Sequence, residues 1–141
     1  MAFVGTHEHT LDGKGRLVLP SKYRARLADR AYVSPGAKCL DLWTPEAFEE
    51  MVERLTVEVR EGRTDPQALR GIGAFSAEVA PDSQGRIMLP ERLREFAGLT
   101  RNVVVNGAFS KIEIWDVDRW TEQVPDLDVT IAAAIQAGSG I

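Results

Sequence analysis

Residues 12–20 read DGKGRLVLP, and residues 82–90 read DSQGRIMLP. Asp, Gly, Arg, Leu and Pro recur at the same five positions with an offset of 70 residues, and an aliphatic residue follows the arginine in both copies. An internal repeat of this kind indicates two similar structural modules in one chain. In both copies, an arginine directly follows a turn that contains glycine.

The residues around the first copy predict a short series of elements. Two segments rich in β-forming residues, 3–11 and 16–19, are joined by the Asp-Gly-Lys-Gly turn, so we expect them to form a hairpin. Pro20 ends the second strand, because proline cannot donate to a strand ladder. A short basic helix is expected over residues 22–28.

The second copy predicts the same order of elements. Strands are expected at 75–80 and 86–89, and a short helix over 91–97 is terminated by Gly98. Further short strands are expected in both modules at 31–33, 38–43, 103–105 and 111–115.

Longer helices are expected outside the repeated elements. Apolar residues from Phe48 to Val59 recur at spacings of three and four, which is typical of an amphipathic helix. A weaker helix is expected over 67–72, and a weak helix with a frayed end over 126–141. We expect one compact domain over 1–141, divided into a first module at 3–55, a helical connector at 56–73, a second module at 74–122 and a C-terminal tail at 123–141.

Composition indicates an ordinary globular protein. The 141 residues are 44% hydrophobic and 27% charged, which is usual for a soluble domain. Apolar stretches fall far short of the roughly 20 residues that a membrane span needs, and the N-terminus lacks a secretory signal pattern. Cys39 is the single cysteine, which favours a reducing compartment and a cytoplasmic protein.

The net charge of −4 conceals an uneven distribution. Residues 14–30 hold six basic side chains and one aspartate, whereas residues 46–65 hold three basic and seven acidic side chains. An acidic protein can still present one basic face to a polyanion. The alternative is that the basic residues merely solvate an exposed helix.

The two copies of Asp-x-x-Gly-Arg-aliphatic-x-Leu-Pro, each followed by a short helix and a strand that ends in tryptophan, resemble the MraZ family. This family belongs to the AbrB/MraZ swapped-hairpin barrel superfamily, and the resemblance extends from Phe3 to Asp116. It implies an α+β, mainly β fold: a barrel of two tandem, pseudo-symmetric AbrB-like swapped-hairpin modules with connecting and peripheral helices.

The resemblance also implies a function. MraZ-like proteins are bacterial transcription factors that bind short G-rich direct repeats in double-stranded DNA upstream of the division and cell-wall gene cluster, which includes their own gene. They form ring-shaped homo-oligomers, often octamers or larger. The chain is therefore expected to be cytoplasmic and nucleoid-associated, with no membrane partner.

The DNA-contacting element of that family corresponds to repeated positions here, which are Asp12, Lys14, Gly15 and Arg16, and again Asp82, Gly85 and Arg86. Gln84 replaces the lysine in the second copy, and the following helix is roughly neutral. We therefore expect the first module to dominate DNA contact, with Arg86 assisting. Lys22 and Arg24, in the helix that follows the first turn, are expected beside Arg16 at flanking phosphates.

These residue types suit recognition of DNA. A hairpin or two-stranded ribbon can enter the major groove, where the planar fork of Arg16 matches guanine O6 and N7. Glycine lets the backbone approach a phosphate, and the flexible Lys14 suits the same group. Asp12 either accepts backbone N–H groups of the turn or orients Arg16. The alternative is that the Asp–Arg pairs only fasten the barrel.

Other functional classes receive less support. His7 and His9 face the same way on a strand but have no third ligand nearby in the sequence, so no metal site is expected. Cys39 has no evident base partner, so no catalytic residue and no cofactor are expected. The alternative class is a protein-binding or structural ring-forming module without DNA readout, which would recruit a partner through the acidic segment 46–65.

Overall fold

The computed structural model describes residues 2–27 and 29–141, and their fold is α+β, as expected. The strands are β1 (Thr6–Thr10), β2 (Arg16–Val18), β3 (Ala31–Pro35), β4 (Leu40–Trp43), β5 (Ala77–Val79), β6 (Arg86–Met88), β7 (Asn102–Gly107) and β8 (Ile112–Asp116). The helices are α1 (Ser21–Leu27), α2 (Pro45–Arg60), α3 (Pro66–Phe75), α4 (Glu91–Ala97) and α5 (Val117–Gln136). The helices hold more residues than the strands, so the expectation of a mainly β chain is wrong. The predicted end of the first helix, Ala28, lies outside the described residues.

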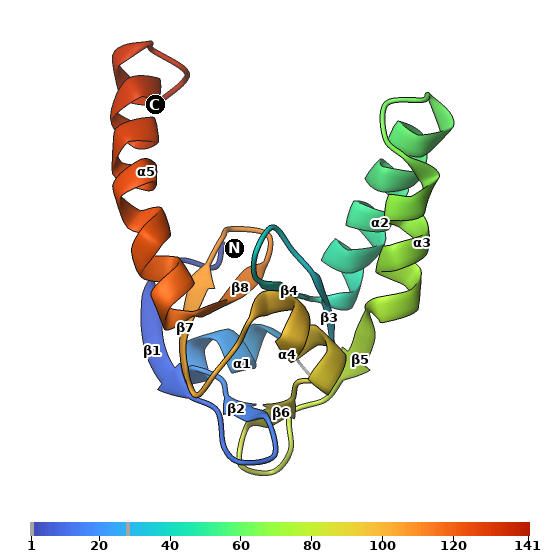
Figure 1. Cartoon of the computed structure of the whole chain (residues 1–141), viewed down its shortest axis with the longest axis vertical. Helices are drawn as coiled ribbons and strands as arrows, with labels where there is room; N and C mark the ends of the chain where they lie inside the picture. Colours follow the sequence, from blue (N-terminus) through green and yellow to red (C-terminus); the bar gives the residue numbers. More distant parts are fainter. Residues whose placement is uncertain (1, 28) are drawn as a thin grey trace.

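Six strands form one antiparallel sheet in the order β1-β7-β8-β4-β3-β5 (Figure 1). Its two outer strands are exchanged between the modules. β1 of the first module pairs with β7 of the second, with Glu8 opposite Val104, and β5 of the second pairs with β3 of the first, with Tyr32 opposite Glu78. The repeated sequences therefore build one shared sheet.

The remaining strands, β2 and β6, pair with each other as a separate two-stranded ribbon. The predicted hairpin between the segments 3–11 and 16–19 is therefore wrong. The turn itself closes, since the Asp12 amide donates to the carbonyl of Arg16 at 3.0 Å, but the strands on either side then separate. They separate because each finds its ladder partner in the other module.

The core lies between the sheet, the ribbon and the two short helices. Leu17 and Ile87 point inward from the centre of the ribbon and are fully buried. Leu27 of α1 and Leu93 of α4 pack into the same cluster. Full burial of such a side chain stabilises the fold by about 1.5–3 kcal/mol, so these inward positions hold the ribbon against the rest of the molecule.

The long helices begin at clear N-caps. The Thr44 hydroxyl accepts a hydrogen bond from the Ala47 amide at 3.2 Å, and Pro45 follows at the first helical position. The Asp116 carboxylate accepts from the Asp118 amide at 3.2 Å and so begins α5. Gly98 adopts a left-handed conformation at the end of α4, as the sequence predicts.

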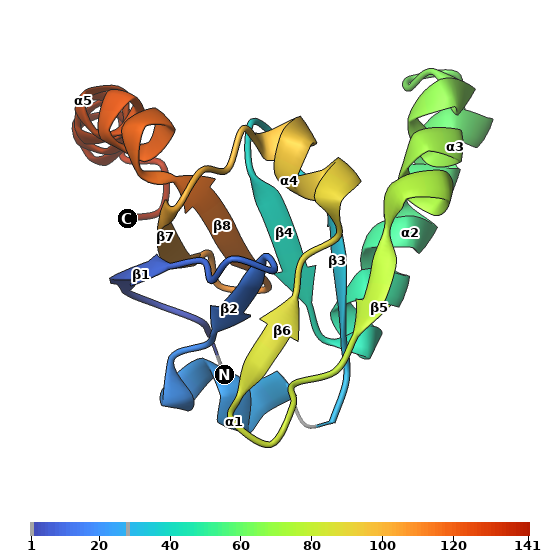
Figure 2. The ribbon, with the colours of Figure 1, turned by 60° about the horizontal axis from the view of Figure 1, so that its bottom comes forward.

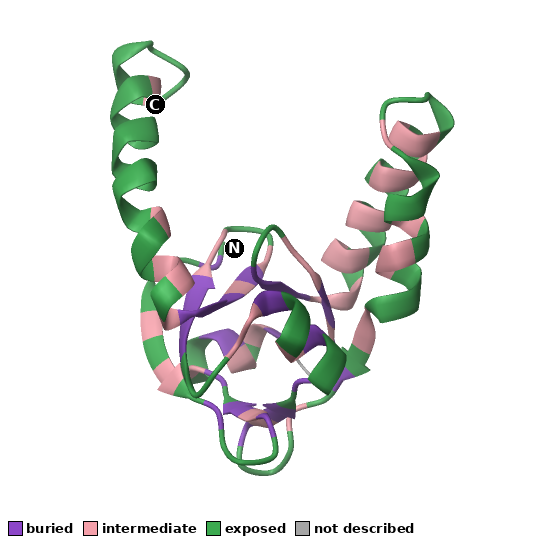
Figure 3. Ribbon diagram, viewed as in Figure 1, coloured by how far each residue is buried: buried purple, intermediate pink, exposed green. Residues whose placement is uncertain are grey.

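Helices α2 and α3 project as a pair from one side of the sheet, and α5 projects from the other (Figure 1). None of the residues that the structure describes in these three helices is buried (Figure 3). The C-terminal helix was expected to be weak and to start near residue 126, but α5 runs without a break from Val117 through Pro125 to Gln136. No helix in the described part of the chain is long and apolar enough to cross a bilayer.

The expected module boundaries stay a prediction. The boundary at 55/56 falls within α2, that at 73/74 within α3 and that at 122/123 within α5.

Candidate nucleic-acid interface

The β2–β6 ribbon presents one outward face, on the side of the molecule opposite the projecting helices (Figures 1 and 2). Arg16 is paired with Met88, and Val18 is paired with Arg86. Because side chains alternate along a strand, these four point outward while Leu17 and Ile87 point into the core. Two arginines and two apolar side chains therefore share one small surface, related by an approximate two-fold exchange of the modules.

An aspartate in the preceding turn holds each arginine. The Asp12 carboxylate accepts hydrogen bonds from the backbone amides of Lys14 and Arg16, both at 2.9 Å, and from Nε of Arg16 at 2.6 Å. Asp82 repeats this pattern, with Nε of Arg86 at 2.8 Å. Both roles considered for Asp12, turn stabilisation and arginine orientation, are therefore present together.

This arrangement leaves the outer end of each guanidinium available. Among residues 2–27 and 29–141, the Nη nitrogens of Arg16 and Arg86 form no hydrogen bond. Both side chains are about a quarter exposed. An arginine that is fixed through Nε and open at Nη1 and Nη2 can donate two parallel hydrogen bonds to one acceptor group.

Hydrogen bonds within the turns lower the pKa of both aspartates. The hydrogen bond from the Arg16 backbone amide, with smaller contributions from its side chain and from the Lys14 amide, lowers the pKa of Asp12 from 3.8 to about 2. The equivalent bonds from Arg86 also lower the pKa of Asp82. Both aspartates therefore stay ionised throughout the physiological pH range.

Each turn is packed against an arginine from the other module. Gly15 is buried with a φ of +79°, and a Cβ atom at this position would lie 2.6 Å from Cζ of Arg94. Gly85 has a φ of +75°, and a Cβ there would collide with the guanidinium of Arg24. Each turn therefore requires glycine for two reasons, the positive φ and the close approach of a guanidinium.

This placement corrects one expectation. The sequence predicts Arg24 beside Arg16 at the first turn, but its guanidinium lies against the second turn, because the ribbon brings the start of α1 to Gly85. The Leu19 amide donates to the Gly85 carbonyl at 3.2 Å, and the Leu89 amide donates to the Gly15 carbonyl at 3.0 Å. The arginine that packs against the first turn is instead Arg94, whose guanidinium lies against Gly15.

The other predicted basic residues lie at different distances from the ribbon. Lys14 is exposed at the tip of the first turn. Lys22 lies over the ring of Tyr23, with its Nζ 5.2 Å from the ring centroid, and beside Gly5. The structure therefore places Lys14 next to Arg16 and Lys22 at the N-terminal segment of the chain.

Arg94 and Arg101 are two basic residues that were not singled out from the sequence. Both line a surface hollow of about 280 Å³ beside the first turn, together with Asp12, Gly13 and Gly15. The repeat contains a signal for the first of them, because Arg94 follows Arg24 at the same offset of 70 residues. Arg101 carries no such signal, since it reaches the turn only through the strand exchange, in which the Leu11 amide donates to its carbonyl.

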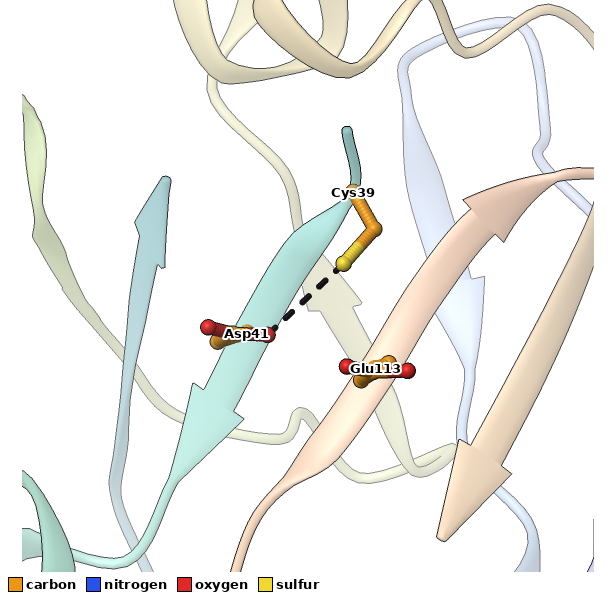
Figure 4. Close-up of side chains that lie close together, drawn as sticks. All are labelled: Cys39, Asp41 and Glu113. Carbon is orange, nitrogen blue, oxygen red and sulfur yellow. Dashed lines mark hydrogen bonds between the residues drawn. The ribbon is translucent and has the colours of Figure 1, made fainter. Parts of the chain in front are cut away.

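A second cluster of polar groups lies within the sheet (Figure 4). Cys39, Asp41 and Glu113 place a thiol and two carboxylates within 4.8 Å of one another, the only such group among residues 2–27 and 29–141 with the chemistry of a metal site. The Lys111 ammonium already lies there, 3.0 Å from Asp41 and 3.8 Å from Glu113. Burial raises the pKa of the Cys39 thiol, so the thiolate that a metal requires is disfavoured.

The buried carboxylate and the lysine stabilise each other. Burial raises the pKa of Asp41, and the nearby Lys111 opposes that shift. Burial, the largest single effect, lowers the pKa of Lys111, but the charge and hydrogen bond of Asp41 together with the charge of Glu113 outweigh it and leave the pKa raised. The cluster is thus a structural ion pair with a protonated thiol that donates to Asp41 at 3.7 Å.

His7 and His9 do lie on the same side of β1, as their alternation predicts. The ring of His7 packs edge-on against Tyr23 at 5.4 Å between centroids. Burial, with a smaller contribution from His7, lowers the pKa of His9. The His7 ring is therefore held by Tyr23, while its Nε2 is buried without a hydrogen-bond partner among the described residues.

Comparison with known proteins identifies the family of the chain. A family model described as "MraZ protein, putative antitoxin-like" matches residues 2–68 and 74–133. The chain belongs to the MraZ family. The two matched segments of the MraZ model include both Asp-x-x-Gly-Arg turns and both strands of the ribbon.

Curated members of the MraZ family cover most of the chain. A protein of Nocardioides sp. is 42% identical over 130 residues, which are 86% of this chain and 85% of that protein. A protein of Cutibacterium acnes is 40% identical over 122 residues, or 84% of each chain. A protein of Arthrobacter sp. is 32% identical over 140 residues, or 99% of each. All three carry the name transcriptional regulator MraZ.

Proposed function

We propose that this chain is a sequence-specific, DNA-binding transcriptional regulator and not an enzyme. It binds short direct repeats in its own promoter as a ring-shaped oligomer and regulates the bacterial division and cell-wall gene cluster. Its place in the cell is the cytoplasm, in association with the nucleoid. The name shared by its relatives supports regulation of transcription, and the motif resemblance described above supports the operator and the ring.

One observation carries the proposal: a two-stranded ribbon presents two arginines that aspartates hold in place, on a face left clear by the helices (Figure 2). The major groove of B-DNA is about 12 Å wide and admits a two-stranded ribbon. The Nη1 and Nη2 groups of Arg16 donate to O6 and N7 of a guanine, the commonest base-specific contact of arginine.

Both turns take part in this contact. The modules differ at Lys14 and Gln84, which favours the first turn for phosphate binding. Each turn is nevertheless completed by an arginine of the other module, so the basic surface spans the whole ribbon. Arg94 and Arg24 neutralise phosphates at the two ends, while Arg16 and Arg86 lie between them.

The strand exchange supports the finer description of the fold. β1 pairs across to β7, β5 pairs across to β3, and β2 pairs with β6, so each module supplies its partner with strands. We infer that this is the swapped-hairpin barrel of the AbrB/MraZ superfamily, built from tandem halves of one chain.

Helix α5 supports assembly of several copies. Val124, Leu127, Ile131 and Ile135 form one exposed apolar row along it. Such a row on a projecting helix marks a protein interface. If it contacts a different surface on the next copy, the interface is heterologous and generates a ring. Neighbouring copies then present their ribbons in the same sense, which suits direct repeats about 10 bp apart.

The test is DNA binding by the full chain to the fragment upstream of its own gene. The logarithm of the binding constant should fall with the logarithm of salt concentration by about 0.9 for each phosphate neutralised. Arg16→Ala should abolish sequence-specific binding and leave the mass of the oligomer unchanged. Arg54→Ala, which removes an exposed arginine of α2, should bind like the wild type. Retained promoter binding by Arg16→Ala would refute the assignment of this residue.

A second candidate is a protein-binding or structural ring without DNA readout. The exposed apolar row of α5 and the acidic face of α2 favour it. It predicts an oligomer that binds the promoter fragment no better than unrelated DNA at every salt concentration.

A further inference from the structure

Two apolar side chains occupy the face that the proposed function assigns to DNA. Val18 is 43% exposed and Met88 is 47% exposed, although both belong to strands whose other residues are packed or paired. Single exposed apolar residues are common on protein surfaces. These two differ because they share a surface of four outward side chains, in which the other two are the arginines.

The register places each apolar side chain beside an arginine. Val18 lies directly opposite Arg86, and Met88 lies directly opposite Arg16. Side chains directly opposite in an antiparallel pair have Cβ atoms about 4.5–5.5 Å apart. Successive bases on one DNA strand are about 3.4 Å apart. An arginine on one base therefore positions its apolar neighbour over the same or the next base pair.

We propose that Val18 and Met88 contact the C5-methyl groups of thymines in the major groove, next to the guanines bound by Arg86 and Arg16. The thymine methyl is the one apolar group among the recognition features of the four bases in this groove. The positive charge of the flanking arginines complements DNA and opposes a second copy of the same face. This inference rests on the proposed DNA binding and adds a base preference to it.

The test removes the methyl groups without changing base pairing. The fragment upstream of the gene is amplified with dUTP in place of dTTP, with primer sites outside the protected region, so every internal thymine becomes uracil. Wild-type protein should bind the uracil fragment more weakly, by about fourfold for each methyl group that it buries. Affinity is measured by fluorescence anisotropy at one salt concentration.

Two variants assign that loss to residues. Val18→Ala and Met88→Ala should each weaken binding to the thymine fragment and reduce the difference between thymine and uracil fragments. Val57→Ala is a matched control, because this valine is 42% exposed on α2, away from the ribbon. It should keep the full difference between the two fragments.

The outcomes separate this inference from the proposed function. If the wild type binds thymine and uracil fragments equally while Arg16→Ala still abolishes binding, the function stands and the methyl contact is refuted. If Val18→Ala and Met88→Ala both keep the full difference in affinity between the thymine and uracil fragments, the methyl contact is also refuted. If the ribbon variants change the oligomer mass, the face belongs to an interface between copies. If the wild type binds neither fragment, both proposals fail.

Discussion

The guanidinium of Arg94 lies against the backbone of Gly15, although the two residues come from different modules. Nε of Arg94 donates to the carbonyl of Leu89 at 3.0 Å, and the amide of Leu89 donates to the carbonyl of Gly15 at 3.0 Å. The turn that presents Arg16 is therefore completed by the second module. The reciprocal contact between Arg24 and Gly85 makes the dependence mutual.

Gly15→Ala should destabilise the protein by about 1–2 kcal/mol, because an L-residue is strained at a φ of +79°. Displacement of Arg94 adds to this cost. Gly13→Ala is the matched control in the same turn, since no atom lies within 4 Å of its added Cβ, and its effect should stay within about 0.5 kcal/mol. Urea unfolding at one protein concentration measures both. Equal effects of the two substitutions would argue against the packing of Arg94 on this turn.

The carboxyl group of Asp12 should titrate near pH 2, compared with 3.8 for an ordinary aspartate. Because its folded-state pKa is lowered, the stabilisation from this turn is fully present above about pH 4 and is lost as the pH falls towards 2. Arg16→Ala should raise the pKa only part of the way, because the backbone amide remains and contributes most. Carbon-detected NMR titration tests this, and an ordinary pKa in the wild type would contradict it.

Lys111→Met should destabilise the fold by about 3 kcal/mol at neutral pH, because it leaves the buried Asp41 carboxylate without its cation. The loss should shrink as the pH falls, since protonation then relieves the unpaired charge. Combining it with Asp41→Asn should recover much of the stability. Unfolding curves at pH 5 and pH 8 provide the comparison. A loss that does not depend on pH would indicate that packing of the lysine stem matters more than its charge.

If the proposed assembly forms through α5, Ile131→Asp combined with Ile135→Asp should reduce its mass, because both side chains lie in the exposed apolar row of this helix. The circular dichroism spectrum should stay nearly unchanged, since neither residue is buried within the chain. Thr130→Asp adds a charge at a neighbouring exposed position and should leave the mass unaltered. Light scattering measures the result, and an unchanged mass in the double variant would exclude this row as the interface.

Much of the local structure follows from the sequence. The Asp-x-x-Gly-Arg turns and the short helices after each proline appear where their residues predict them. These features depend on contacts between residues close together in the chain, such as the Asp12 carboxylate and the Arg16 amide. The start of α5 at Val117, well before the expected residue 126, was not predicted, because Pro125 favours a break in the helix.

The sequence by itself determined that the chain contains two like modules, each with an aspartate four residues before an arginine. Only the tertiary structure decided that β2 pairs with β6, which places Val18 and Met88 on one face with Arg16 and Arg86. It also decided that Arg24 packs against the second turn and Arg94 against the first. The physical reason is that the alternation of apolar and polar residues along a strand does not specify which other strand it pairs with. Strands 70 residues apart pair because that arrangement buries Leu17 and Ile87 together in one core.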